Sequence, residues 1–210
     1  MLLRDNIYDA VRADILACRL VPGEELREQD LAARYNVSRA PVRDALLRLE
    51  QDQLVTVHPR QGYSVNRISI ADACEIFQYR VVLESNCASL AAEHASVEEL
   101  DRLEQFRAVA AGTDFIDYNH DFHSAVAAAS GNRRMAKALA DLVDQAERFV
   151  RISVSSIKGH DPAQLIAEHG ALIDALQRRD ARGAARLVEM HVTKAERRII
   201  AALNRSAVIP

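Results

Sequence analysis

A series of six helical patterns, which fills the last two thirds of the chain, most constrains its fold. Each pattern repeats apolar residues at helical spacing, and together they cover residues 71–93, 97–111, 114–130, 133–155, 162–179 and 181–204. The signals that start these helices are Ser69 with Asp72, Ser96 with Glu99, Asp161 before Pro162, and Asp180. Because the connections are short, consecutive helices should pack antiparallel. The sequence therefore predicts an all-α bundle over residues 69–210.

The first 68 residues have a different pattern. Helical spacing over 5–17 is followed by a turn at 20–26, a short helix at 27–35 and a second helix at 40–51. Asn36 suits the tight turn between the last two helices, Ser38 is a good N-cap, and Pro41 falls in the first turn. Two strands follow at 54–58 and 63–67, with Pro-Arg-Gln-Gly between them. This order predicts a winged helix–turn–helix domain with a small β-hairpin wing, so the chain as a whole should be mainly α.

Composition excludes several classes of protein. Of the 210 residues, 49% are hydrophobic and 27% charged, which is typical of a globular chain. The three cysteines form no CxxC motif and are odd in number, which suits a reducing cytoplasm. No apolar run approaches the roughly 18 residues that cross a bilayer, and the N-terminus lacks signal-peptide features. We therefore expect a cytoplasmic protein without membrane contact.

The third helix of the N-terminal domain, at 40–51, carries a pattern typical of DNA recognition. Six arginines face three acids between Arg34 and Arg67, although the whole chain has a net charge of −3. Arg39 and Arg43 lie four residues apart on the polar face, where an arginine can donate two hydrogen bonds to guanine. Ser38 and the free N–H groups of the helix start suit a phosphate. An isolated arginine pair is more often a solvated helix face; the cap, the helix pair and the basic hairpin together favour DNA.

The motifs also resemble a known family. Residues 7–67, and SRAPVRDAL above all, are similar to the DNA-binding domain of the GntR family of bacterial transcription regulators. Through RVVLESNCASLAA, FHSAVAAASGN and EHGALIDALQRRD, the rest resembles the helical FCD effector domain of the FadR-type subfamily. The resemblance implies a homodimer on an inverted-repeat operator in double-stranded DNA, contacted by Ser38, Arg39, Ala40, Pro41 and Arg43, with Gln61 and Gly62 at the wing tip. The chain departs from the family in having Gln61-Gly62 where Arg-Gly is common, and Gln29 where some members have a basic residue.

Three histidines are predicted to face the interior of the bundle. On helical projections His169 and His191 fall in the middle of apolar faces, and His123 flanks the apolar face of its helix together with Asn119. A single inward histidine is more often part of the core, but three imidazoles and an amide oxygen form a plausible site for a divalent metal. The family resemblance implies the same four ligands, with Asn119 where Asp is common. Zinc is the expected ion, with nickel or manganese as alternatives.

Arg80 and Glu84 also lie on the inward face of their helix. They are either a buried i,i+4 ion pair, or Arg80 binds the carboxylate of a small acid, as FCD effectors commonly require. The projections place His120 and Asp117 toward solvent and no acid beside the inward histidines. His58, His94 and His160 are expected at the surface.

These observations predict a DNA-binding transcription regulator whose operator affinity is modulated by a small organic acid at a metal site. Two alternatives come from other classes: a repressor that senses the metal directly, without an organic effector, and a histidine–metal hydrolase. The hydrolase is disfavoured because no general base is expected beside the histidines. We therefore expect no enzymatic activity.

Overall fold

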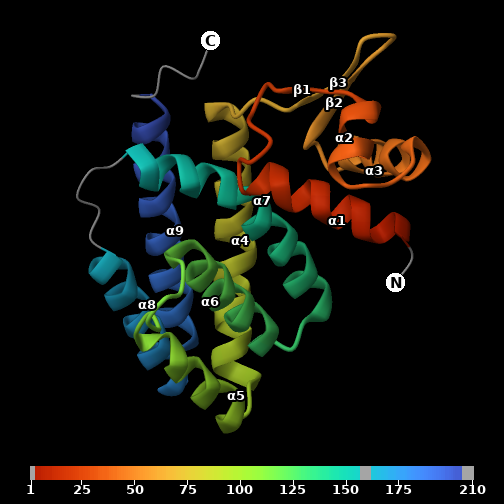
Figure 1. Ribbon diagram of the computed structural model, residues 1–210. Helices are drawn as coiled ribbons and strands as arrows, with labels where there is room; N and C mark the ends of the chain where they lie inside the picture. Colours follow the sequence, from red (N-terminus) through yellow and green to blue (C-terminus); the bar gives the residue numbers. More distant parts are fainter. Residues whose placement is uncertain (1–2, 157–161, 205–210) are drawn as a thin grey trace. The chain divides into compact units, whose positions relative to one another are not determined.

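The structure is a computed structural model that describes residues 3–156 and 162–204. The chain divides into two compact units, Met1–Ile68 and Ser69–Pro210, which are considered separately (Figure 1). Within the described residues, no helix combines the length and apolar character needed to cross a membrane.

The N-terminal unit is a helix–turn–helix with a small sheet. Its elements are α1 (Leu3–Leu16), β1 (Glu25–Leu26), α2 (Glu28–Arg34), α3 (Arg39–Gln51), β2 (Val55–His58) and β3 (Gly62–Val65). Asn36 adopts φ 53°, the left-handed conformation expected for the turn between α2 and α3. The apolar side of α3 is buried against the unit's core through Val42, Ala45, Leu46 and Leu49. The predicted winged helix–turn–helix is confirmed.

The wing is a three-stranded sheet rather than a simple hairpin. β1 pairs antiparallel with β3 (Leu26 opposite Tyr63), so the strand order is β1-β3-β2. The expectation that residues 20–26 form only a turn was therefore wrong, because two residues are too few to show an alternating pattern. Gly62 permits this pairing: its φ is +115°, and a Cβ atom there would lie 3.0 Å from the Leu26 carbonyl oxygen.

The C-terminal unit is the predicted helical bundle. Its elements are α4 (Ile70–His94), α5 (Val97–Asp101), a 3₁₀ helix η1 (Arg102–Arg107), α6 (Phe115–Ala129), α7 (Arg133–Ser156), α8 (Pro162–Gln177) and α9 (Ala181–Leu203). The two long helices α4 and α9 pack side by side, α6 and α7 cover α4, and α8 packs on α9 (Figure 1). Ser69, Ser96 and Asp180 each cap a helix as predicted, and Asp161 lies outside the described residues.

The prediction of a single α-helix over residues 97–111 was wrong. The α-helix ends at Asp101, continues as η1, and reaches an extended residue at Ala108 (φ −148°, ψ 152°). Contacts with other helices compete with helical hydrogen bonding here: the Phe106 carbonyl accepts a bond from the Tyr118 hydroxyl, and the Arg107 side chain contacts Asp174 of α8. Local spacing could not reveal these contacts.

Candidate functional site

Three helices bring His123, His169 and His191 together inside the C-terminal unit. They come from α6, α8 and α9 respectively, and all three side chains are buried. One ring nitrogen from each lies within 4.8 Å of the others, and neighbouring ring centroids are 4.9–5.5 Å apart. The sequence therefore identified the residues that converge, although they are separated by up to 68 positions (191 − 123).

Two of the rings are oriented by carboxylates. His123 Nδ1 lies 2.6 Å from Glu84 Oε2, and His191 Nδ1 lies 2.8 Å from Glu168 Oε2. An ionised carboxylate only accepts hydrogen bonds, so each Nδ1 carries the proton. A neutral ring then has its lone pair on Nε2, the atom that can bind a metal. The expectation that no acid lies beside these histidines was wrong. Glu84 reaches His123 from the inward face of α4, and Glu168 reaches His191 although it lies off the centre of its own helix face.

The third ring is oriented by a tyrosine. The Tyr118 hydroxyl donates to the Phe106 carbonyl oxygen at 2.6 Å, which uses its only hydrogen. It can therefore only accept from His169 Nδ1, 3.1 Å away, and His169 also has its lone pair on Nε2. That Nε2 atom is buried without a hydrogen-bond partner among the described residues. A buried polar atom of this kind costs about 1–3 kcal/mol unless something binds it.

Burial keeps the rings of His123 and His169 in the form that binds metal. Desolvation lowers the pKa of His123 to about 4, and it lowers the pKa of His169 well below the usual value, with help from the neighbouring imidazoles. Burial alone would raise the pKa of Glu84, but Arg80 and His123 lower it to about 2. Near neutral pH His123 and His169 are therefore neutral imidazoles, and the Glu84 carboxylate that orients His123 is ionised.

The donor set fits a divalent transition metal. Zinc binds imidazole nitrogens at about 2.0–2.1 Å, so two ligands of one ion lie at most about 4.2 Å apart. The histidines need only a small closing movement to reach that separation. The unpartnered His169 Nε2 is the observation that supports an ion here, because nothing else in the described structure satisfies it. Three neutral nitrogens leave further coordination positions for an oxygen ligand.

A cavity of about 40 Å³ adjoins the histidines. Asn119, Arg80 and Arg198 line it together with His123 and His191. Arg80 Nε donates to Glu84 Oε1 at 2.7 Å, so the buried ion pair exists, while the residue also borders the cavity. Asn119 therefore lies beside the histidines, as the sequence implied, but it has no hydrogen bond to them in the described structure.

Sequence reasoning missed several residues of this site. Arg198 follows His191 by seven residues, or two helical turns, and that spacing could have revealed it. Tyr118 could not be found in this way, because its role depends on a contact with another helix.

His120 was expected in solvent, but it is half-buried and contacts Asp144 of α7 at 2.7 Å. Asp117 is exposed, as expected.

The remaining histidines lie apart from this cluster. His94 is exposed at the end of α4. His58 is also exposed and bonds Ser64 across the wing. His160 lies outside the described residues.

The N-terminal unit presents the predicted DNA-contact residues at its surface. Arg39 and Arg43 are exposed at the start of α3, where Arg39 donates to Gln29 and Arg43 makes two hydrogen bonds of 2.7 Å to Glu28. Both acceptors lie on α2, so contacts within the unit already orient the two arginine side chains. Ser38 occupies the N-cap position without a side-chain bond to the helix, which leaves its hydroxyl for another acceptor. The other predicted contact residues are Ala40, Pro41, Gln61 and Gly62; Ala40 and Gln61 are exposed, and Pro41 and Gly62 are half-buried.

Comparison with known families matches both units. The profile described as "Bacterial regulatory proteins, gntR family" matches residues 3–65, and the "FCD domain" profile matches residues 75–194. The chain belongs to the GntR family and carries an FCD domain. It is therefore a DNA-binding transcription regulator and not an enzyme, which removes the hydrolase alternative.

Characterised relatives of this GntR regulator include repressors. The HTH-type transcriptional repressor RspR of Escherichia coli K12 is 27% identical over 197 residues, which cover 90% of this chain and 86% of RspR. The repressor GlaR of the same organism is 29% identical, covering 88% of this chain and 90% of GlaR. Among solved structures, E. coli McbR/YncC has a TM-score of 0.83 at 21% identity, covering 97% of this chain and all of that one. That structural similarity shows a shared fold.

Proposed function

We propose that this regulator is a homodimeric repressor whose affinity for an inverted-repeat operator is modulated by a small organic acid. The acid binds a divalent metal held by His123, His169 and His191, with Asn119 as a fourth ligand. Zinc suits these donors best, and nickel or manganese are alternatives. A cytoplasmic location follows from this role in transcription.

The observation that carries the metal site is the orientation of the three rings. Glu84, Glu168 and Tyr118 each accept from an Nδ1 atom, so all three Nε2 lone pairs are available, and the buried one on His169 has no partner among the described residues. Burying three imidazoles is costly unless a ligand satisfies them. An ordinary core would not need every ring in the same tautomer.

Two arginines support an acidic effector. Arg80 and Arg198 both line the cavity beside the histidines. A guanidinium binds a carboxylate through two parallel hydrogen bonds. The metal supplies a Lewis acid for one carboxylate oxygen, and the arginines neutralise the remaining charge of the ligand.

The small size of the cavity favours a second candidate function. A volume of about 40 Å³ holds water but no organic acid unless side chains move. A repressor that responds to the metal alone needs no larger space. The two candidates differ in whether the metal is sufficient to change operator affinity.

In the N-terminal unit, we assign DNA contact to the start of α3 and to the wing tip. The contact residues are Ser38, Arg39, Ala40, Pro41, Arg43, Gln61 and Gly62. The exposed, pre-oriented Arg39 and Arg43 support this assignment, as does the free Ser38 hydroxyl.

The experiment begins by selecting the operator from a random duplex library with the full-length protein. Operator affinity is then measured by fluorescence anisotropy with metal-free protein, with zinc alone, and with zinc plus a panel of small mono- and dicarboxylates. The proposal expects at least one acid to shift the affinity by about 1–3 kcal/mol, and only when zinc is present. A full shift with zinc alone favours direct metal sensing. No shift under any condition contradicts both candidates.

A further inference from the structure

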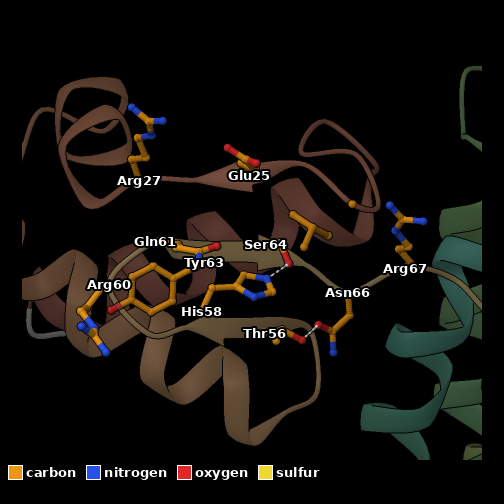
Figure 2. Close-up of a pocket in the computed structure, with 12 residues that line it drawn as sticks. Glu25, Arg27, Thr56, His58, Arg60, Gln61, Tyr63, Ser64, Asn66 and Arg67 are labelled. Carbon is orange, nitrogen blue, oxygen red and sulfur yellow. Dashed lines mark hydrogen bonds between the residues drawn. The ribbon is translucent and has the colours of Figure 1, made fainter.

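The exposed face of the wing sheet forms a polar groove that the site described above does not use. The groove has a volume of about 830 Å³ and runs across all three strands, from the wing tip to the end of β3 (Figure 2). Three arginines line it, Arg27, Arg60 and Arg67, against a single acid, Glu25. Its lining therefore carries an excess of two positive charges, three minus one.

These arginines differ from their neighbours in having no partner. Elsewhere in the unit, Arg34 bonds Asp14, Arg43 bonds Glu28, and Arg48 lies over the ring of Tyr8. The side chains of the three groove arginines make no hydrogen bond, ion pair or ring contact with any residue in the described parts of the chain. A cluster of uncompensated guanidinium groups is an electrostatic footprint for an anionic partner.

One end of the groove continues into the recognition surface. Arg27 is the N-cap residue of α2, directly before Glu28 and Gln29, which hold Arg43 and Arg39 of α3. Arg60 lies in the wing turn, with φ +65°, beside Gln61. Figure 2 shows Arg27 and Arg60 at this end and Arg67 at the opposite end.

We propose that Arg27 and Arg60 bind phosphates of the DNA strand that flanks the bases read by α3. Arg67, at the far end of the groove, lies outside this contact. The proposal rests on the DNA interface assigned above and extends it to two residues outside that set. The contact supplies sequence-independent affinity and fixes the position of the wing on the duplex, because phosphates carry no base information.

DNA is a better occupant than a small anion. The groove is open and every charged side chain along it is exposed, so no buried polar group is present to fix a small ligand. Phosphates along a DNA strand are instead repeated at regular intervals, which suits separate arginines on a continuous surface. Continuity with the recognition helix places that strand at the Arg27 and Arg60 end.

The test uses the full-length protein and two duplexes, the selected operator and a random sequence of equal length. Affinity is measured by anisotropy between about 50 and 200 mM salt for Arg27→Gln, Arg60→Gln and the matched control Arg67→Gln. Each substitution removes one phosphate contact in both subunits of the dimer, so we expect the first two variants to reduce the slope of log affinity against log salt by about 1.8 each, on both duplexes. Arg67→Gln should retain the parental slope, and Arg27→Lys and Arg60→Lys should restore it.

Three outcomes would overturn the proposal: unchanged slopes for Arg27→Gln and Arg60→Gln, a loss confined to the operator, or an equal loss for Arg67→Gln. The last result would indicate only a diffuse charge effect. Arg43→Ala separates this inference from the interface on which it rests. If Arg43→Ala weakens operator binding while Arg27→Gln and Arg60→Gln do not, the groove contact alone is wrong. If Arg43→Ala also binds as the parent does, the assigned interface is wrong.

Discussion

Replacing His169 by alanine should separate the stability of the bundle from its response to metal. The ring is 1% exposed and stacks on Phe122 with centroids 3.8 Å apart. Truncating a buried aromatic ring costs about 3–5 kcal/mol, whereas removing the unpartnered Nε2 atom recovers about 1–3 kcal/mol. The metal-free variant should therefore unfold with a free energy about 2 kcal/mol below that of the parent.

Metal should then widen this difference. An ion at about 100 times its Kd adds about 2.7 kcal/mol to the free energy of unfolding. For a chain of this length each kcal/mol raises Tm by about 2–4 °C, so the parent should gain roughly 5–11 °C. His169→Ala should gain almost nothing, bind less metal and lose any effector response, yet keep its basal affinity for DNA.

The assay is thermal melting of chelator-stripped protein with added Zn²⁺, Ni²⁺ or Mn²⁺, together with metal analysis. His94→Ala is the matched control, because that histidine is exposed and lies apart from the cluster. A parent protein that gains no stability from any of the three ions would refute the reasoning. An equal gain in His169→Ala would do the same, and the three histidines would then be ordinary core residues.

Four further predictions concern operator binding, assembly, zinc affinity and the pH dependence of stability. Arg39→Ala and Arg43→Ala should each lose roughly 1–3 kcal/mol of operator affinity at equal salt without a change in Tm, and full affinity in both would show that α3 is not the recognition helix. Sedimentation should find a dimer at micromolar concentration, since an inverted repeat needs two recognition helices about 34 Å apart, or a multiple of that distance; one monomer per operator would contradict this. Tyr118→Phe should weaken zinc binding about 10–100-fold in a chelator competition, because His169 loses the acceptor for its Nδ1 proton. The control Tyr79→Phe, at an exposed side chain, should leave zinc binding unchanged. The hydrogen bond to Asp144 of α7 raises the pKa of His120 to about 9, above the value of about 6.5 expected in the unfolded chain. The contribution of this contact to stability should therefore be complete below about pH 6.5 and should be lost as the pH rises toward 9. The urea midpoints of the parent and of His120→Gln should converge over that range.

The sequence predicted the helices well because their boundaries depend on local chemistry. Ser96 and Glu99 form the expected capping box, and Asp180 caps α9, since both interactions involve residues within one turn. Where distant residues decide, the prediction failed. The strand β1 exists only because β3 pairs with it, and η1 replaces an α-helix where Phe106 and Arg107 bond other helices.

The same distinction applies to the candidate site. Helical projection found His123, His169 and His191 because direction toward the core follows from spacing along one helix. It could not find Tyr118 or the contact between Glu168 and His191, because both side chains reach histidines on neighbouring helices. Projection gives the direction of a side chain but neither its length nor its partner.

The pairing of β1 with β3 has a consequence for the operator. β1 leads directly into α2, and Glu28 of α2 accepts hydrogen bonds from both Arg43 of the recognition helix and Tyr63 of the wing. Glu28 thus links the wing to the recognition helix and fixes the spacing between these two elements. Inserting one base pair between the segments they contact would shift them by about 3.4 Å and rotate them by about 34°. A half-site lengthened in this way can engage the wing or the helix, but not both.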